Sequence, residues 1–345
     1  MIHTIQIEEF LALTAEIPVA DVRTPAEFEQ GHIPHAHNLP IFTNEERVQV
    51  GTTYKQIGRE EAILLGFEFT GPKWSSFIKE ALAIAPQKKI ALHCWRGGMR
   101  SGAMAWALNL YGFEVYLLEG GYKSYRRWAL EQFNQQFNLL ILGGMTGSGK
   151  TQILRAIKNS GEQMIDLEEL AQHQGSSYGS MGTLIQPSQE QFENNLAYQL
   201  SQINKIKPLW LEDESRTIGK RSIPNPLWDQ MRKAPVIKLH IALEERIRFL
   251  TQEYGKLDSD FLIECTQRIG KRLGPEQTRD AVLAIKENRM SDFIRLVLVY
   301  YDKTYTTGQS MREQRSIYDV QGTLAADLNN VTRILEKVKN IHSTQ

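Results

Sequence analysis

Cysteine is scarce in this chain of 345 residues, which contains only Cys94 and Cys265. The two lie in different predicted domains, so a disulfide framework is excluded and the reducing cytoplasm is the expected compartment. No cluster of residues has the spacing of zinc ligands, and no metal ligands are predicted on that basis. Each cysteine must therefore be judged by its own surroundings.

Long apolar runs and an excess of charge are also missing. No stretch of about 18 apolar residues occurs, so neither a transmembrane helix nor a membrane partner is predicted. Residues 1–13 lack the basic start and apolar core of a signal peptide. Lysine plus arginine and aspartate plus glutamate number 40 each, so contact with RNA would need a local basic patch. The candidate patches are Lys123/Arg126/Arg127, Arg216/Lys220/Arg221 and Lys271/Arg272. Each can equally be an ordinary solvated face.

The first part of the chain alternates short apolar runs with helical patterns, as an α/β domain does. Strands are expected at residues 17–22, 89–93 and 114–118, and a helix at 101–111. Residues 40–73 form a long polar stretch that a minimal domain would not need. We expect this stretch to be an insertion that packs near the loop after strand 89–93. The first domain is predicted to span residues 1–135, with a polar linker at 132–138.

A second α/β domain, residues 136–345, begins with the apolar strand 139–142, followed by a glycine-rich loop and a helix from Lys150 to about Lys158. Further strands are expected at 164–167, 209–211 and 236–241. Ser188, with Gln191 three residues later, predicts the start of a helix. From Leu243 onward the pattern is mainly helical. The expected breaks are Gly270, Gly274-Pro275 and Gly308.

The segment CWRGGMRS (94–101) places a cysteine at the end of a predicted strand, before a glycine-containing loop and a helix. Loop N–H groups and the helix N-terminus converge there, stabilise an anion and lower the pKa of Cys94. Arg96 and Arg100 add positive charge, and Arg100 can grip a tetrahedral oxyanion through two hydrogen bonds. We therefore expect Cys94 to be reactive. Cys265 lies in a helical pattern without these features, and we expect it to be structural.

A complete Walker A pattern, GMTGSGKT (144–151), follows the strand 139–142 and opens a helix, which is the context that this motif requires. Its N–H groups would hold phosphate oxygens, Lys150 would neutralise them, and the Thr151 hydroxyl could reach Mg²⁺. The predicted phosphate-binding residues are Gly144, Gly147, Ser148, Gly149, Lys150 and Thr151.

The apolar strand 209–211 runs into three acidic residues, in the manner of a Walker B segment. Asp213 is the better candidate for contact with the water shell of a metal ion, and Glu212 is nearly as good. An exposed acidic loop is the alternative. The glycine loop 144–151 would hold the diphosphate of any substrate, so its presence does not predict nucleotide hydrolysis.

The first domain resembles the rhodanese family through DVR (21–23), EF (27–28), GHIP (31–34), NLP (38–40) and LEGGY (118–122). In that family the cysteine carries sulfur as a persulfide. Sulfurtransferase rhodaneses usually have four residues between the cysteine and the closing arginine or threonine, whereas five separate Cys94 from Arg100. Five residues is also the spacing of cysteine-dependent phosphatases. The loop alone therefore leaves two alternatives, a chalcogen carrier or a phosphatase.

A rhodanese-like domain followed by a P-loop domain is similar to the bacterial tRNA 2-selenouridine synthase family. The matching blocks occur in order along nearly the whole chain: NEERVQVGTTYKQIG (44–58), HCWRGGMRSGAMAW (93–106), LGGMTGSGKT (142–151), DLEELAQHQGSSYG (166–179) and LEDESRTIGKRSIP (211–224). The resemblance implies a rhodanese-like α/β domain, then a P-loop NTPase-like parallel α/β domain with a helical C-terminal region.

The resemblance further implies exchange of sulfur for selenium at the wobble uridine of tRNAs for lysine, glutamate and glutamine. The 2-thiouridine sulfur would first be alkylated with a geranyl group from geranyl diphosphate. Selenophosphate, supplied by selenophosphate synthase, would then deliver selenium and the geranyl thiol would leave. No tightly bound cofactor is expected beyond these co-substrates and Mg²⁺.

On this resemblance Cys94 would carry selenium as S-selanylcysteine. Arg96, Arg100 and the loop amides would form an anion cradle that the five-residue spacing widens for selenophosphate. Residues 144–151 would hold the geranyl diphosphate, with Asp213 on Mg²⁺. Three alternatives remain: a cysteine-dependent phosphatase or a plain sulfurtransferase, either one fused to a nucleotide-binding domain, and a non-catalytic RNA-binding regulator.

Overall fold

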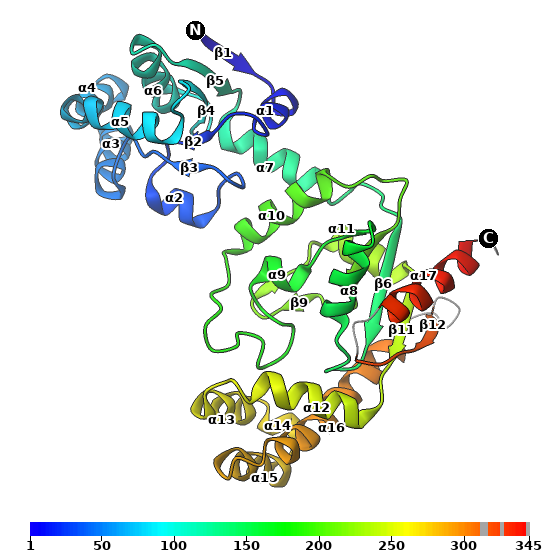
Figure 1. Cartoon of the computed structure of the whole chain (residues 1–345). Coiled ribbons are helices and arrows are strands. Elements are labelled where there is room, and N and C mark those ends of the chain that lie inside the picture. The colour runs from blue at the N-terminus through cyan, green and yellow to red at the C-terminus, as the bar shows by residue number, and fades with distance from the viewer. Residues whose placement is uncertain (311–316, 325–327, 343–345) are drawn as a thin grey trace. The chain divides into compact units, whose positions relative to one another are not determined.

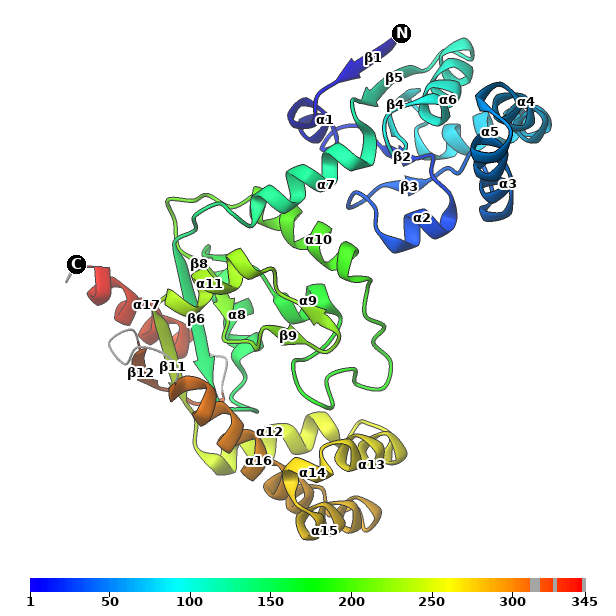
Figure 2. The same ribbon diagram turned by 180° about the vertical axis from the view of Figure 1, so that it is seen from behind.

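The computed structural model describes residues 1–310, 317–324 and 328–342, and the chain divides into two compact units (Figures 1 and 2). One unit comprises Met1–Gln132 and Glu190–Tyr198, and the other comprises Phe133–Gln189 and Gln199–Gln345. The predicted second domain, 136–345, included Glu190–Tyr198, whereas these residues pack with the first unit. No helix in the described part of the chain is long and apolar enough to cross a membrane.

The first unit is built on a five-stranded parallel sheet with the order β1-β5-β4-β2-β3. Its strands are β1 (Ile2–Ile5), β2 (Val19–Asp21), β3 (His37–Asn38), β4 (Lys89–His93) and β5 (Glu114–Leu118). The bounds of β4 and β5 agree with the predicted strands, and β2 is shorter than the predicted 17–22. The short edge strands β1 and β3 were not predicted, because two to four residues carry little periodicity.

Helices surround this sheet: α1 (Ile7–Leu13), α2 (Pro25–Gln30), α3 (Asn44–Gln56), α4 (Arg59–Thr70), the 3₁₀ turn η1 (Gly71–Lys73), α5 (Trp74–Ile84), α6 (Met99–Leu110) and α7 (Gly121–Gln132). The predicted insertion 40–73 folds mostly into α3 and α4. Thr43 and Glu46 begin α3 with a reciprocal capping box. Val50 and Phe69 pack on the core cluster that also contains Cys94. The insertion therefore belongs to the hydrophobic core around the reactive cysteine.

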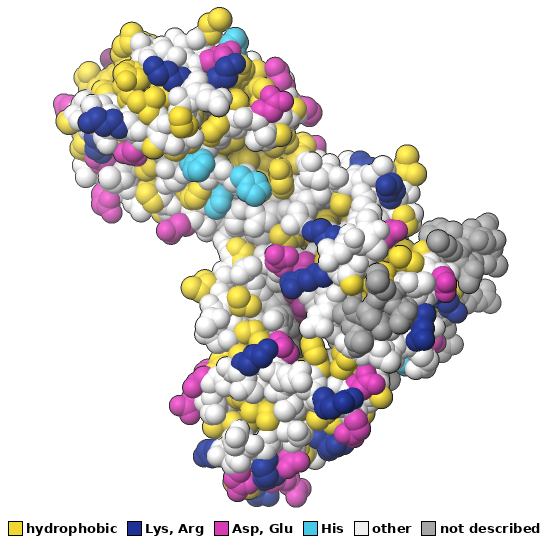
Figure 3. Space-filling model, viewed as in Figure 1, with side chains coloured by type: hydrophobic (Ala, Val, Ile, Leu, Met, Phe, Trp, Pro, Cys, Tyr) yellow, Lys and Arg dark blue, Asp and Glu magenta, His cyan; other side chains and the backbone are white. Residues whose placement is uncertain are grey.

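Helix α10 (Gln189–Ser201) supplies the segment Glu190–Tyr198 of the first unit. Arg126 on α7 donates to the Glu193 carboxylate at 2.6 Å and to the Asn194 side chain at 2.6 Å. One of the three candidate basic clusters is therefore partly used in packing. On the face shown in Figure 3, Lys and Arg side chains are scattered, and they form no single broad patch there.

The second unit contains a five-stranded sheet, all of whose pairings are parallel, with the order β12-β11-β6-β8-β7. Its strands are β6 (Leu139–Gly144), β7 (Gln163–Met164), β8 (Leu209–Glu212), β11 (Val236–His240) and β12 (Ile317–Gln321). A small antiparallel pair joins β9 (Thr217–Ile218) to β10 (Arg221–Ser222). The predicted strand 164–167 ends early, because the Asp166 side chain caps a helix from Leu167.

The remaining helices are α8 (Lys150–Asn159), α9 (Leu167–Ala171), α11 (Asn225–Lys233), α12 (Leu243–Tyr254), α13 (Ser259–Arg268), α14 (Gly270–Leu273), α15 (Pro275–Lys286), α16 (Met290–Ser310) and α17 (Leu328–His342). The predicted break at Gly308 is wrong, since α16 continues to Ser310, and strand β12 interrupts the expected helical region. Helices α12 to α16 share a core that contains Cys265, which is fully buried. This position agrees with a structural cysteine.

Candidate active sites

The cysteine loop lies between β4 and α6, so that Cys94 follows the carboxyl end of a central parallel strand. Cys94 is only 3% exposed. Its Sγ accepts a hydrogen bond from the Gly98 N–H at 3.4 Å and one from the Ser101 hydroxyl at 3.2 Å. Burial alone would raise the pKa of Cys94, but these hydrogen bonds and the Arg100 charge hold that pKa below its usual range. The thiolate is therefore favoured, as the sequence predicts.

The segment after β5 supports this loop from behind. The Tyr122 N–H donates to the Cys94 carbonyl at 2.8 Å, and the Lys123 N–H donates to the Trp95 carbonyl at 3.0 Å. Gly121 has φ +60, and a side chain there would collide with the backbone of the cysteine loop. The LEGGY segment thus fixes the loop through its backbone, which requires glycine at this point.

The two arginines of the loop lie in different surroundings. Arg96 is exposed. The Arg100 guanidinium donates to both carboxylate oxygens of Glu27, at 2.6 and 3.1 Å. Burial acts to raise the pKa of Glu27, but Arg100 holds it below its usual range. Sequence reasoning missed this role of Glu27, although the residue stands in the quoted EF segment. The Glu27 carboxylate that accepts from Arg100 is itself held by the capping box with Thr24.

The glycine loop follows β6 and leads directly into α8. Gly147 and Gly149 have φ +80 and +71, values that favour glycine. The Gly144 N–H donates to the Tyr305 hydroxyl at 2.7 Å, and Arg246 Nε donates to the Thr146 carbonyl at 2.9 Å. The predicted phosphate-binding residues run from Gly144, the last residue of β6, through this loop to Lys150 and Thr151 at the start of α8. Helices α12 and α16 therefore brace the loop.

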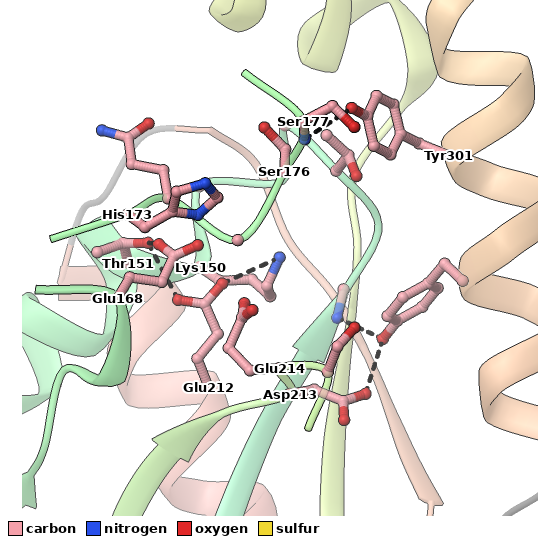
Figure 4. A pocket seen from close by; sticks show the side chains of 18 of the residues that line it. Lys150, Thr151, Glu168, His173, Ser176, Ser177, Glu212, Asp213, Glu214 and Tyr301 are labelled. Atoms are coloured by element: carbon pink, nitrogen blue, oxygen red, sulfur yellow. Dashed lines mark hydrogen bonds and ion pairs between the residues drawn. The ribbon is translucent and has the colours of Figure 1, made fainter. Parts of the chain in front are cut away.

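Carboxylates surround the start of α8 (Figure 4). Lys150 Nζ lies 3.2 Å from Glu212 Oε1, and the Thr151 hydroxyl lies within hydrogen-bond distance of Glu212, at 3.1 Å, and of Glu168, at 3.3 Å. The Asp213 carboxylate instead accepts from the Tyr305 hydroxyl at 3.4 Å. Neighbouring strand residues point to opposite faces, so only one of Glu212 and Asp213 can face Thr151. Of the two acids weighed in the sequence, the structure places Glu212 beside the Walker A residues.

Glu168, Glu212 and Glu214 together offer carboxylate oxygens that lie within 4.8 Å of one another. Burial and the Glu212 charge raise the pKa of Glu168 to about 8, and burial with the same charge raises the pKa of Glu214 well above its usual range. Burial acts to lower the pKa of Lys150, but Glu212 and Glu214 outweigh it and raise that pKa. Hard oxygen ligands beside a phosphate-binding loop fit Mg²⁺, whose charge would relieve this repulsion. Sequence reasoning missed Glu168 and Glu214 as candidate ligands.

A cavity of about 1020 Å³ in the second unit joins the glycine loop and the carboxylates to an aromatic side. That side is formed by Phe249, Tyr254, Tyr300 and Tyr301 from α12 and α16. In Figure 4, Tyr301 lies on α16, across the pocket from Lys150 and Glu212. The arrangement suits a ligand with a charged phosphate end and an apolar or aromatic tail.

Family models match both parts of the chain. Residues 6–127 match the rhodanese-like domain, which includes Cys94. Residues 137–336 match the AAA domain of tRNA 2-selenouridine synthase, which includes the glycine loop and the three carboxylates. The chain belongs to the tRNA 2-selenouridine synthase family. The rhodanese-like and P-loop folds predicted from the sequence are thereby confirmed.

Members of the tRNA 2-selenouridine synthase family from several bacteria are similar over much of their length. The protein of Salmonella newport is 38% identical over 323 residues, which cover 91% of this chain and 85% of that protein. The protein of Sulfurovum sp. is 36% identical over 327 residues, with coverages of 84% and 87%. The protein of Nitrosomonas europaea is 39% identical over 265 residues, with coverages of 72% and 67%. All three are named tRNA 2-selenouridine synthase.

Proposed function

We propose that this chain is a tRNA 2-selenouridine synthase, which replaces the sulfur of 2-thiouridine at the wobble position with selenium. The observation that carries the proposal is the presence, in one member of this family, of a thiolate-stabilising cysteine loop and of a Walker A glycine loop that lines a large cavity. The tRNA substrate follows from the name shared by the relatives. The proposed tRNAs are those for lysine, glutamate and glutamine.

The first proposed step is alkylation of the 2-thiouridine sulfur by geranyl diphosphate at the glycine loop. A sulfur lone pair forms the new C–S bond, the C–O bond breaks, and its electron pair leaves with diphosphate. The proton on N3 of the base passes to solvent. Lys150 and the loop N–H groups neutralise the departing diphosphate, while Phe249 and Tyr301 offer apolar surface to the geranyl chain. Glu168, Glu212 and Glu214, with the Thr151 hydroxyl beside them, would hold Mg²⁺, which would supply further positive charge.

The second proposed step uses selenophosphate, which selenophosphate synthase would supply. The alkylated sulfur is a better leaving group than a thione sulfur, so selenium can displace the geranyl thiol from C2 of the base. Cys94 is the proposed nucleophile toward the donor, with Arg96, Arg100 and the loop amides as the anion cradle. The covalent form of Cys94 that the family resemblance implies is S-selanylcysteine.

Three other functions are alternatives that the experiment below would distinguish. A phosphatase or a plain sulfurtransferase accounts for the cysteine loop, but the match of residues 137–336 to the synthase domain argues against both. A non-catalytic RNA-binding regulator would have no use for the lowered pKa of Cys94.

The test is nucleoside analysis of tRNA from cells that lack the protein and are complemented with variants. Wild type should restore 2-selenouridine, Cys94→Ser should accumulate S-geranyl-2-thiouridine, and Lys150→Ala should leave 2-thiouridine unmodified. Cys265→Ser provides the matched control, because it changes the other cysteine and should restore selenouridine wherever the protein folds. Persistence of 2-selenouridine without the protein, or its full restoration by Cys94→Ser, contradicts the proposal.

A further inference from the structure

Selenium begins and ends the proposed exchange at the same oxidation level. It is bound to phosphorus as a selenide in selenophosphate and to carbon as a selenide in 2-selenouridine. An attack by the Cys94 sulfur on selenium would leave the electron pair of the P–Se bond on phosphorus. The products would be phosphite and an S–Se bond, and a second thiol would later have to reduce that bond.

The chain offers no suitable second thiol. Its sequence contains only one other cysteine, Cys265. That residue is fully buried in the helical core of the second unit, and burial raises the pKa of its thiol. A buried thiol with a raised pKa is a poor nucleophile toward an S–Se bond. A route through S-selanylcysteine would therefore depend on an external thiol in every turnover.

The cysteine loop has the features that phosphoryl transfer needs. Five residues separate Cys94 from Arg100, and the loop directs the Gly98 N–H at Sγ. Arg100, which also pairs with Glu27, brings a guanidinium to the start of α6, where it lowers the pKa of Cys94. The Ser101 hydroxyl lies 3.2 Å from Sγ and donates to it. This hydrogen bond stabilises sulfur as a thiolate, the form in which it leaves phosphorus when a phosphocysteine is hydrolysed.

We infer that Cys94 takes the phosphoryl group of selenophosphate, not its selenium. The thiolate attacks phosphorus, an S–P bond forms, the P–Se bond breaks, and its electron pair leaves with hydrogen selenide. The hydrogen selenide then attacks C2 of the alkylated base, and the C–S bond breaks to release the alkyl thiolate. Water attacks the phosphocysteine, phosphate leaves, and the electron pair of the S–P bond returns to Cys94. No atom changes its oxidation level, and water is the only added reactant.

This inference rests on the proposed use of selenophosphate, and it replaces the S-selanylcysteine form that the family resemblance implies. The proposed function and the inference can fail separately. Purified full-length protein is mixed with selenophosphate that carries radioactive phosphorus, quenched rapidly and analysed by intact-protein mass spectrometry. Phosphoryl and selenium adducts have nearly equal mass, so the label and the isotope pattern of selenium distinguish them. We expect labelled protein without the selenium pattern. Ser101→Ala should slow hydrolysis roughly tenfold and raise the labelled fraction, because its thiolate is less stabilised. Cys94→Ser should remain unlabelled.

A second measurement follows the phosphorus product by NMR during turnover without added thiol. Phosphate as the product supports the inference. Phosphite, a selenium pattern on Cys94, or turnover that stops until a thiol is added overturns it. The inference is also overturned if neither the wild type nor Ser101→Ala becomes labelled while Cys94→Ser still releases phosphate at the wild-type rate. If cells make 2-selenouridine through this protein while Cys94 carries selenium, only the inference fails and the proposed function stands.

Discussion

The cysteine loop and the glycine loop both follow central parallel strands, yet the electrostatics of their surroundings are opposite. At the cysteine loop, hydrogen-bond donors and the Arg100 charge lower the pKa of Cys94 and so favour its thiolate. At the glycine loop, three carboxylates crowd Lys150, and the pKa of Glu168 is raised to about 8. The second site therefore keeps protons on Glu168 and Glu214, which a bound cation would displace.

This contrast teaches that a Walker A sequence alone does not define an anion site. Lys150 is already paired with Glu212, at 3.2 Å, so an incoming diphosphate competes with a carboxylate for it. A cation held by Glu168, Glu212 and Glu214 would remove that competition. The ligand of the glycine loop is therefore expected to bind together with Mg²⁺.

The largest expected effect is that of Cys94→Ser, which should abolish selenium transfer and leave alkylation unchanged. Cys94→Ser should reduce selenium incorporation into S-geranyl-2-thiouridine tRNA by at least about a thousandfold, because a hydroxyl at this position does not ionise near neutral pH. Alkylation of 2-thiouridine tRNA by geranyl diphosphate should stay at the wild-type rate. Both rates are measured on purified protein by nucleoside chromatography. If Cys94→Ser slows alkylation as much as selenium transfer, the sites are not chemically independent and the comparison breaks.

The next effect concerns the cation of the glycine loop. Lys150→Ala should weaken binding of inorganic diphosphate, measured calorimetrically with Mg²⁺ present, by roughly 10- to 100-fold, since charge-assisted hydrogen bonds are lost. Lys158→Ala is the matched control, because this exposed lysine lies on the same helix α8. Because Lys150→Ala removes the ion pair of Glu212, thermal melting must also show that this variant still unfolds cooperatively. Unchanged diphosphate affinity in Lys150→Ala would remove the glycine loop from the proposed alkylation step.

The sequence predicted those parts of the two sites that are local in the chain. Cys94 with its loop, and residues 144–151 with β6 and α8, are contiguous motifs whose geometry follows from neighbouring residues. Glu27 and Glu168 could not be predicted, because Glu27 meets Arg100 across 73 positions and only the fold brings them together. The choice of Glu212 over Asp213 depends on the rotation of β8, which the sequence does not specify.

A pH effect sharpens the difference in charge. Because the pKa of Glu168 is about 8 in the folded protein, the folded state holds a proton that the unfolded chain releases above about pH 4.5. The free energy of unfolding of the second unit should therefore fall as pH rises from about 5 to 8. Mg²⁺ affinity should rise over the same range, by up to about tenfold per pH unit, as the carboxyl loses its proton.

Glu168→Gln tests this effect because it preserves the shape of the side chain and removes its ionisation. Mg²⁺ titration calorimetry at several pH values, together with thermal melting, should show weaker binding and a shallower pH dependence in this variant. Glu214 also carries a raised pKa, so part of the dependence should remain. Glu169→Gln, at an exposed neighbouring position, should behave as wild type. A slope in Glu168→Gln equal to that of wild type assigns the titration to another group.

The smallest effect lies in the Glu27–Arg100 pair of the cysteine loop. Glu27 neutralises part of the Arg100 charge that favours the thiolate, so Glu27→Gln should lower the pKa of Cys94 further. Ser101→Ala should raise that pKa, because it removes a hydrogen bond to Sγ. The rate of alkylation by iodoacetamide as a function of pH measures both shifts. Opposite signs in the two variants mean that Arg100 keeps its place without Glu27 and acts through charge. An upward shift in both variants means that Glu27 positions Arg100. The cysteine loop would then need a carboxylate to hold Arg100, just as Glu212 pairs with Lys150 at the glycine loop.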